Sequence, residues 1–222
     1  MKKLFGLFIF FLIAGKCLAD NPLSDAVIGD GLMEALRVGI GNTVTSVSME
    51  DGYLGNELIR IPMPDSIQKV ETLIRAAGYG ETLDNFVQSM NRAAEKAAPE
   101  AKVMFLDAIG QITLPDARNI LQGRDNEATL YFRGKTEDKL ATLFQPIIQK
   151  SLADVGVTRY YQDLEKTIQT LPVQGLGDVN LEQYVTNKAL DGLFTVLAQE
   201  EKKIRENPEA QVSDLLKNVF GH

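Results

Sequence analysis

The sequence predicts an all-α protein, a single compact multi-helix domain that follows an N-terminal signal peptide. Apolar residues recur at steps of three and four along most of the chain, which places them on one side of an α-helix. No stretch alternates between apolar and polar residues for long enough to form a sheet with one buried face. We therefore expect residues 20–222 to form one domain of about eight to ten mostly short helices.

Residues 1–19 have the composition of a secretory signal peptide. Lysines at positions 2 and 3 precede an apolar run over residues 4–14, and small residues end the segment. Lys16 interrupts the run well before the roughly 20 apolar residues that a membrane-spanning helix needs. Lys16 also stands where a lipoprotein signal has a small residue, although a minor lipidated form at Cys17 stays open. We expect cleavage after this segment and a periplasmic protein with no transmembrane segment.

The charge of the remaining chain disfavours nucleic acids as partners. The full sequence has 23 Lys and Arg against 30 Asp and Glu, and three of those lysines (Lys2, Lys3 and Lys16) leave with the signal, so the net charge becomes about −10. Such a surface repels phosphate backbones and anionic membrane surfaces.

The rarity of cysteine and histidine excludes several chemistries. Cys17 is the only cysteine and lies in the signal segment, and His222 is both the only histidine and the last residue. Disulfides, thiol nucleophiles, catalytic triads and His- or Cys-based metal sites are therefore not expected. A calcium loop starting at Asp178 is also not expected, because its twelfth position is Ala189 instead of Glu. We predict no cofactor and no metal.

Residues 24–64 predict a long helix, a turn and an extended segment. Ser24 is suited to cap a helix that ends near Ser48, and its inner side would hold Val27, Leu32, Leu36, Val38 and Val44. The glycines in this helix complete no nucleotide-binding fingerprint, so close contact with another helix explains them better. Asp51–Asn56 has turn chemistry. Ile59–Pro64 contains two prolines and is expected to lie extended in a groove between helices.

Helices of moderate length are expected from Pro64 to Gly123. Pro64 suits the first turn of a helix that runs to about Ala77. Residues 81–98 form the next helix, and Pro99 separates it from a helix over residues 100–112, for which the pattern predicts that Val103, Phe105, Leu106 and Ile109 are buried. Thr113 and Asp116 form a capping box for a short helix ended by Gly123.

The second half of the domain contains the longest helical pattern. A helix opened by Asp125 is expected to close at Gly134, and helices over 135–155 and 158–171 follow. After a loop at 172–178, residues 180–208 form one long helix with Asn180 and Gln183 at its N-terminal cap. A last helix is expected over 209–220.

Four separated blocks of sequence resemble one known family. They are DGYLGNELIRIPMP at 51–64, MNRAAEKAAPEAK at 90–102, YFRGKT at 131–136 and YVTNKALDGLFTVLAQEEKKIRENP at 184–208. The chain is similar over nearly its whole length to exported bacterial proteins catalogued as domain of unknown function 4197. The resemblance implies export in a Gram-negative bacterium and a helical fold. It implies no activity, substrate or catalytic residue.

Two groups of polar residues are candidates for a ligand site. Tyr131 and Arg133 lie in an aromatic and cationic cluster around Gly134, which suits an anion or a sugar ring. The same cluster is also typical of a core anchor with an arginine at a helix C-terminus. Lys188 and Asp191 share one side of the long helix with Tyr184 and Thr195. That row is either a ligand-binding row or, as we favour, a solvated face.

Charged residues on apolar faces form a further group of candidates. Glu201 interrupts the apolar stripe of the long helix, and Arg205 lies one turn further. Together they predict either a catalytic carboxylate with a raised pKa or, as we favour, an ion pair that joins two helices. Arg60 lies between two isoleucines beside the expected groove. Arg92, Glu95 and Lys96 lie opposite an apolar stripe and are expected to be solvated.

Two functions stay open. The first is a non-enzymatic module that binds a periplasmic protein or a small ligand near residues 59–64 and 131–136. The alternative is a hydrolase or lyase that acts on a cell-envelope substrate and pairs Glu201 or Glu95 with Asp191 or Asp116. The lack of histidine and cysteine favours the binding module.

Overall fold

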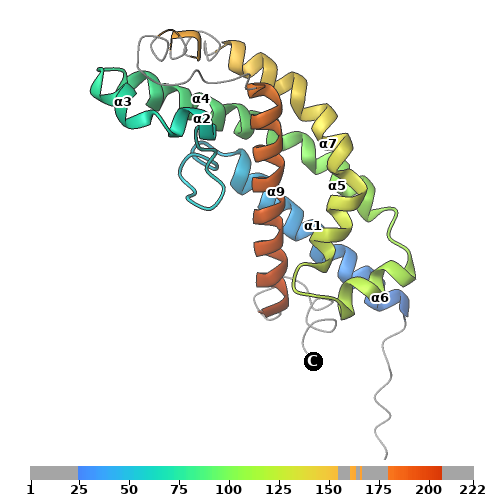
Figure 1. Ribbon diagram of the computed structural model, residues 1–222. Helices are drawn as coiled ribbons and strands as arrows, with labels where there is room; N and C mark the ends of the chain where they lie inside the picture. Colours follow the sequence, from blue (N-terminus) through green and yellow to red (C-terminus); the bar gives the residue numbers. More distant parts are fainter. Residues whose placement is uncertain (1–24, 155–160, 164–165, 167–179, 207–222) are drawn as a thin grey trace, which may run out of the picture.

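The protein is all-α in the part of the chain that the structure describes. The computed structural model describes residues 25–154, 161–163, 166 and 180–206, and it places no strand there (Figure 1). The long helices are α1 (Asp25–Ser48), α4 (Gly80–Ala97), α7 (Glu127–Asp154) and α9 (Leu181–Glu206). The short ones are α2 (Asp65–Gln68), α3 (Glu71–Ala76), the 3-10 helix η1 (Ala98–Glu100), α5 (Ala101–Ile109) and α6 (Leu114–Gln122). The predicted fold class is confirmed.

Some predicted segments lie outside this described part. They are the signal peptide, the loop at 172–178, the last helix over 209–220, and the helix over 158–171 apart from residues 161–163 and 166.

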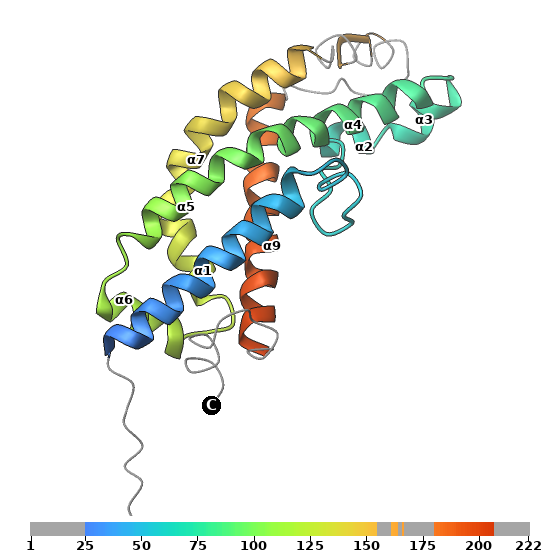
Figure 2. The same cartoon turned by 180° about the vertical axis from the view of Figure 1, so that it is seen from behind.

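The centre of the fold is α9, which packs against α1, α4 and α7. Figure 1 shows α9 in front of the more distant α1, with α7 at its side. The helices α7 and α9 are antiparallel, because Arg133 contacts Asp191 whereas the earlier Ala128 contacts the later Glu201. Seen from behind, α4, η1 and α5 follow one another beside α1 (Figure 2). This arrangement gives α7 and α9 a long shared interface.

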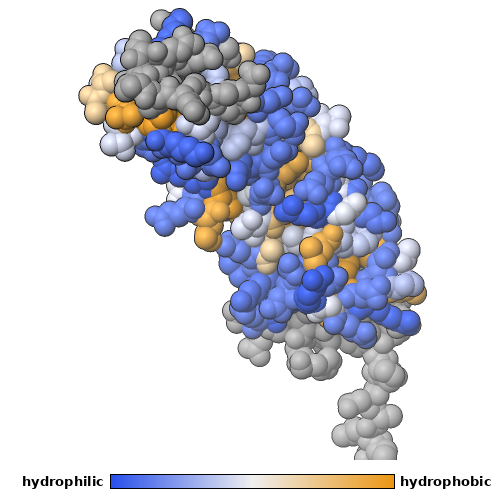
Figure 3. Space-filling view, in the orientation of Figure 1, coloured by the Kyte–Doolittle hydropathy of each residue, from blue (hydrophilic) through white to orange (hydrophobic). Residues whose placement is uncertain are grey.

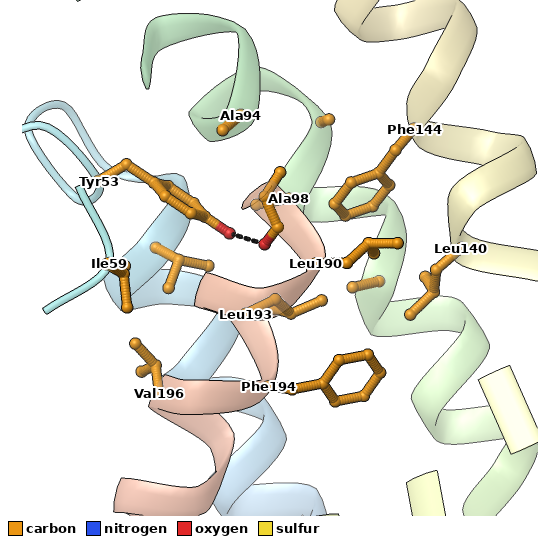
Figure 4. Close-up of a cluster of buried hydrophobic side chains, with 14 of the residues drawn as sticks. Tyr53, Ile59, Ala94, Ala98, Leu140, Phe144, Leu190, Leu193, Phe194 and Val196 are labelled. Atoms are coloured by element: carbon orange, nitrogen blue, oxygen red, sulfur yellow. Dashed lines mark hydrogen bonds between the residues drawn. The ribbon is translucent and has the colours of Figure 1, made fainter. Parts of the chain in front are cut away.

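The core is built from aromatic rings and small residues. Phe105 of α5 lies between two other phenylalanines, with ring centroids 5.5 Å from Phe132 of α7 and 5.8 Å from Phe194 of α9. A stripe of small residues, which allows helices to approach closely, is fully buried at Ala93, Ala94, Ala97, Ala98 and Ala101. Figure 4 shows Ala94 and Ala98 in the same cluster of buried side chains as Leu190 and Leu193 of α9.

The segment after α1 is held in a groove, as the sequence predicts. Asp51 has a φ of 62°, a left-handed conformation that aspartate tolerates better than most residues, and the chain reverses there. Tyr53, Ile59 and Ile61 are then buried. The Tyr53 hydroxyl donates a hydrogen bond to the backbone oxygen of Ala189 at 2.6 Å, which ties this segment to α9 (Figure 4).

The N-terminal caps of α6 and α9 contain residues that the sequence predicted there. Thr113 Oγ1 accepts from the Asp116 backbone N–H, and Asp116 Oδ2 accepts from the Thr113 backbone N–H, so the capping box of α6 is complete. At α9, Asn180 Oδ1 accepts from the Gln183 backbone N–H at 2.9 Å. The Gln183 side chain, which the sequence placed in this cap, donates instead to Asn187 Oδ1 further along the helix.

The expected helix break at Gly134 is wrong, because α7 runs without interruption from Glu127 to Asp154. Phe132, Thr136, Leu140 and Phe144 are all buried and follow one another at steps of four. A glycine inside a helix costs about 1 kcal/mol relative to alanine, whereas burying one large apolar side chain contributes about 1.5–3 kcal/mol. Packing across Gly134 therefore outweighs the cost of the glycine.

Smaller corrections concern the first half. The helix expected over 64–77 divides into α2 and α3, because the Val70 backbone N–H bonds to the Ile67 oxygen and tightens the turn there. Val103 is 58 % exposed and Leu106 and Val38 are also exposed, although burial was predicted. In α5 the buried side is formed instead by Ala101, Phe105, Ala108 and Ile109.

Candidate functional site

An open cavity lies between α7 and α9 on their shared interface. Its volume is about 550 Å³. The α7 side is formed by residues at and before the start of that helix, namely Asp125, Asn126, Thr129, Leu130 and Arg133. The α9 side is formed by Phe194, Thr195, Ala198, Gln199 and Lys202. Figure 3 shows the face in the orientation of Figure 1 as mostly hydrophilic with small, separated apolar areas.

Arg133 is a polar side chain of this cavity that three neighbouring groups hold in place. Its guanidinium carbon lies 4.6 Å from the centroid of the Phe194 ring, a cation–π contact. Its Nη1 donates to Glu137 Oε1 at 3.0 Å and to Asp191 Oδ1 at 3.4 Å. The ring and the two carboxylates hold the guanidinium in one orientation.

The other end of the cavity carries opposite charges. Lys202 of α9 lines it, and the Lys202 ammonium forms a 3.5 Å ion pair with Glu206. Asp125 lies on the facing side. Between Phe194 and Lys202 the axis of α9 rises by about 12 Å, at 1.5 Å per residue. The cavity therefore has a cationic group at each end, with Leu130 and Ala198 among the apolar side chains that line it.

Glu201 and Arg205 form a separate, buried network beneath the cavity. Glu201 is 6 % exposed and accepts from the backbone N–H groups of Ala128 and Thr129, at 2.9 and 2.8 Å, and from Thr129 Oγ1. Arg205 donates to Glu201 and, through Nη2, to the backbone oxygen of Ile120 at 2.7 Å. The carboxylate thus caps the N-terminus of α7 and the guanidinium the C-terminus of α6.

Within the described part of the chain, the space beside this ion pair is small. The two hollows that touch Glu201 have volumes of about 10 and 20 Å³. Such a space holds at most a water molecule. Glu201 and Arg205 thus form an ion pair within α9 whose remaining hydrogen bonds join this helix to α7 and α6, in line with the structural interpretation that the sequence favoured.

A second buried carboxylate, Glu95, corrects the expectation that it is solvated, whereas Lys96 on the same helix is exposed as expected. Glu95 is 5 % exposed and accepts from the backbone N–H of Tyr53 at 3.1 Å and of Leu54 at 3.3 Å. Arg92 pairs with it at 2.7 Å and also reaches Asp51. The segment after α1 covers this side of α4, and a single helical pattern gives no information about such a cover.

Asn91 is a buried polar residue that the sequence interpretation missed. Its side-chain amide accepts from the Ile61 backbone N–H at 2.8 Å and donates to the Ile61 oxygen at 2.9 Å, which imitates one rung of a sheet. Together with Glu95, one turn later, it holds the groove segment on α4. A polar pair spaced four apart inside an alanine-rich helix was the available signal.

The candidate residues from the sequence do not share one pocket. Arg133 lines the cavity, and Asp191 reaches it through Arg133. Glu201 and Arg205 form the buried network described above. Arg60 is exposed on the segment after α1.

Tyr131 and Lys188 lie elsewhere again. The Tyr131 hydroxyl is buried without a hydrogen-bond partner among the described residues, and burial raises its pKa. The Lys135 ammonium lies 5.6 Å from the Tyr131 ring. Lys188 lies 6.0 Å from the ring of Tyr184, whose hydroxyl donates to the Pro62 oxygen. Both tyrosines therefore have structural surroundings distinct from the cavity.

The carboxylates proposed for an enzyme are committed to separate partners. Glu201 and Glu95 each accept backbone N–H groups and pair with an arginine, Asp191 pairs with Arg133, and Asp116 caps α6. Among the described residues, no three His, Cys, Asp or Glu side chains gather closely enough to hold a metal ion. In the same part of the chain, we find no helix long and apolar enough to cross a membrane.

Comparison with known proteins identifies the family. A family model described as "Protein of unknown function (DUF4197)" matches residues 22–221, so the chain belongs to this family. The match confirms the resemblance that the four sequence blocks indicated. No curated protein and no solved structure matches the chain.

Proposed function

We propose that this DUF4197 protein is an exported, non-enzymatic binding module that takes a small ligand in the cavity between α7 and α9. The observation that carries the proposal is Arg133, an oriented guanidinium at the edge of an open cavity. The volume of about 550 Å³ falls in the range of about 300–1,000 Å³ typical of small-molecule sites. Apolar side chains with a few placed polar groups are also typical of such sites.

The location of the cavity on two long helices supports binding further. Both walls belong to helices whose relative position is fixed by the Glu201 network and by the aromatic core. A site on rigid elements needs little reorganisation when a ligand enters. The alternative enzyme, a carboxylate hydrolase or lyase, receives no comparable support, because it needs two carboxylates that converge on one cleft.

The groove near residues 59–64, which the sequence offered as a second binding region, is filled by the chain itself. Ile59, Ile61 and Met63 are buried in it. We therefore assign ligand binding to the α7–α9 cavity alone.

A cavity-blocking variant tests the proposal. Thr195→Trp adds a large side chain to the cavity wall. Thr142→Trp is the matched control, because both threonines are exposed on a long helix and donate to the backbone oxygen four residues earlier, at 2.7 Å for Thr195 and 2.9 Å for Thr142. A thermal-shift screen of anionic, neutral and cationic metabolites should find compounds that raise the Tm of the wild type and of Thr142→Trp, but not of Thr195→Trp. If no compound behaves in this way, the proposal is wrong.

Export is tested independently. Expression in a Gram-negative host, fractionation and N-terminal sequencing should give a periplasmic protein that starts at Asp20. A cytoplasmic protein that retains Lys2 and Lys3 would contradict this part of the proposal.

A further inference from the structure

We infer that the ligand of the α7–α9 cavity is an organic carboxylate, whose head group binds Arg133 and whose apolar body lies along Leu130 and Ala198. This inference rests on the proposed function and names the chemical class of its ligand. It is carried by the orientation of Arg133, by the exposure of its partner Asp191 and by the distribution of charge along the cavity.

Arg133 is prepared to bind a planar anion. Within the described chain, Arg133 makes both of its ion pairs through Nη1. Its guanidinium carbon, Cζ, lies 4.6 Å from the centroid of the Phe194 ring. A guanidinium has five N–H donors in a rigid plane, which matches the two oxygens of a carboxylate. Stacking on Phe194 has already restricted the Arg133 side chain. That side chain therefore loses less conformational entropy when a ligand binds.

Asp191 makes the kind of contact with the Arg133 guanidinium that a ligand carboxylate would make. Its side chain is 60 % exposed, and its Oδ1 lies 3.4 Å from Nη1, longer than the 3.0 Å of the Glu137 contact. Exposed ion pairs contribute little stability, so Asp191 is exchanged at small cost. A carboxylate that enters from the cavity therefore replaces a group of the same chemistry.

The remaining charges favour a singly charged head group. Glu137 stays at 3.0 Å from the guanidinium after Asp191 has moved. A phosphate monoester carries nearly two negative charges at neutral pH and would be repelled more strongly by Glu137 than a carboxylate would. A cationic head group would be repelled by the positive charge of the Arg133 guanidinium.

The walls of the cavity beyond Arg133 determine which ligand body fits. Leu130 and Ala198 line the cavity between its two charged ends, and these ends are separated by about 12 Å along α9. A hydrocarbon chain of several carbons fits this distance and buries apolar surface that water otherwise covers. Inorganic anions and formate have no hydrocarbon chain and would not gain the free energy of burying this apolar surface.

Four six-carbon probes separate the head groups. Isothermal titration calorimetry on the processed chain would use hexanoate, hexyl phosphate, hexanol and hexylamine. We expect hexanoate to bind at least about tenfold more tightly than the other three. Its contact with Arg133 is charge-assisted, unlike that of hexanol, while Glu137 repels the phosphate more strongly and the guanidinium repels the amine. Thr195→Trp should abolish the binding, and Thr142→Trp should leave it unchanged.

Two substitutions in the ion-pair cluster should act in opposite directions. Arg133→Gln should weaken hexanoate binding at least about tenfold, whereas Asp191→Asn should tighten it about two- to fivefold because the competing carboxylate is gone. The control is Arg75→Gln, because Arg75 is equally paired and exposed, with Glu71 at 2.8 Å and Asp84 at 2.7 Å, and does not line the cavity. A merely structural role of Arg133 does not explain tighter binding by Asp191→Asn.

The outcomes distinguish this inference from the proposed function. Hexanol, hexylamine or hexyl phosphate binding as tightly as hexanoate overturns the carboxylate assignment, and so does hexanoate binding that Arg133→Gln leaves unchanged. Failure of all four probes also overturns it. In each case the proposed function stands as long as the metabolite screen yields a compound whose binding Thr195→Trp removes.

Discussion

Glu201 and Arg205 lie one turn apart on α9, with Glu201 Oε1 and Arg205 Nη2 2.9 Å apart, and they connect three helices. The carboxylate accepts backbone N–H groups at the start of α7, and the guanidinium donates to backbone oxygens at the end of α6. Each charge therefore interacts with the helix end of opposite partial charge. The pair also supports the cavity, because Thr129, one of its walls, donates to Glu201.

Neutralising one member of this pair should be strongly destabilising. Glu201→Gln leaves the guanidinium of Arg205, 16 % exposed, without its counter-ion, and we expect the free energy of unfolding to fall by about 3 kcal/mol. Urea denaturation followed by circular dichroism measures it. Glu206→Gln is the control on the same helix, because the ion pair of Glu206 with Lys202 is exposed. This substitution should lower the free energy of unfolding by less than about 0.5 kcal/mol. Equal effects of the two substitutions would contradict the structural role of Glu201.

Replacing either of two glycines inside long helices by alanine should change the free energy of unfolding, in opposite directions at the two positions. At Gly192 of α9 a Cβ atom would lie 2.6 Å from Tyr53 Cε1 and 3.1 Å from Ile59 Cβ, whereas at Gly134 of α7 it would meet no atom within 4 Å. Gly192→Ala should lower stability by about 1–3 kcal/mol through overpacking. Gly134→Ala should raise it by about 0.5–1 kcal/mol through helix propensity. Thermal unfolding compares the two, and a gain in Tm at Gly192 would show that the close approach of Tyr53 to α9 is absent.

Removing the Asn91 amide should loosen the groove segment. Asn91→Ala leaves the N–H and C=O groups of Ile61 without their partner in a buried position, which costs about 1–3 kcal/mol for each unsatisfied group. We also expect the Ile61 amide to exchange its hydrogen much faster than in the wild type. Hydrogen exchange followed by NMR measures this, with the exposed Gln88→Ala on the same helix as the control. Unchanged protection at Ile61 would contradict the role of Asn91.

Tyr53 should make the fold sensitive to high pH. Burial, and secondly the negative charge of Glu95, raises the pKa of the Tyr53 phenol above its usual value of about 10. The folded state therefore holds this proton more strongly than the unfolded state, so the stabilisation is complete below about pH 10 and is lost as the pH rises above it. The free energy of unfolding should fall by up to about 1.4 kcal/mol per pH unit in that range.

The comparison with Tyr53→Phe isolates this effect. The variant should be less stable at neutral pH by about 1 kcal/mol, because the hydrogen bond to the Ala189 oxygen is lost. Its stability should then decline less steeply above pH 10 than that of the wild type. Parallel declines in urea titrations across this pH range would mean that Tyr53 does not titrate as described.

The correct and the wrong predictions differ in the range of the interactions behind them. The capping box of Thr113 and Asp116 and the cap at Asn180 depend on residues three positions apart, and both were read from the sequence. The break expected at Gly134 was wrong, because burial of Phe132 and Thr136 against other helices outweighs the local preference of glycine. Glu95 was expected in solvent, but a segment some 40 residues earlier in the chain covers it.

The candidate site shows the same division. Arg133 and Asp191 were both candidates, but their contact joins positions 58 residues apart in sequence, and the cavity beside them exists only when α7 and α9 pack. Gln199 and Lys202, which line its far end, carried no signal by themselves. The sequence alone determined the helical class, most helix boundaries in the described part of the chain and the scarcity of cysteine and histidine, because composition and periodicity are local properties. The tertiary structure decided which carboxylates are buried and which cation faces a cavity, because both depend on what the rest of the chain places over each helix face.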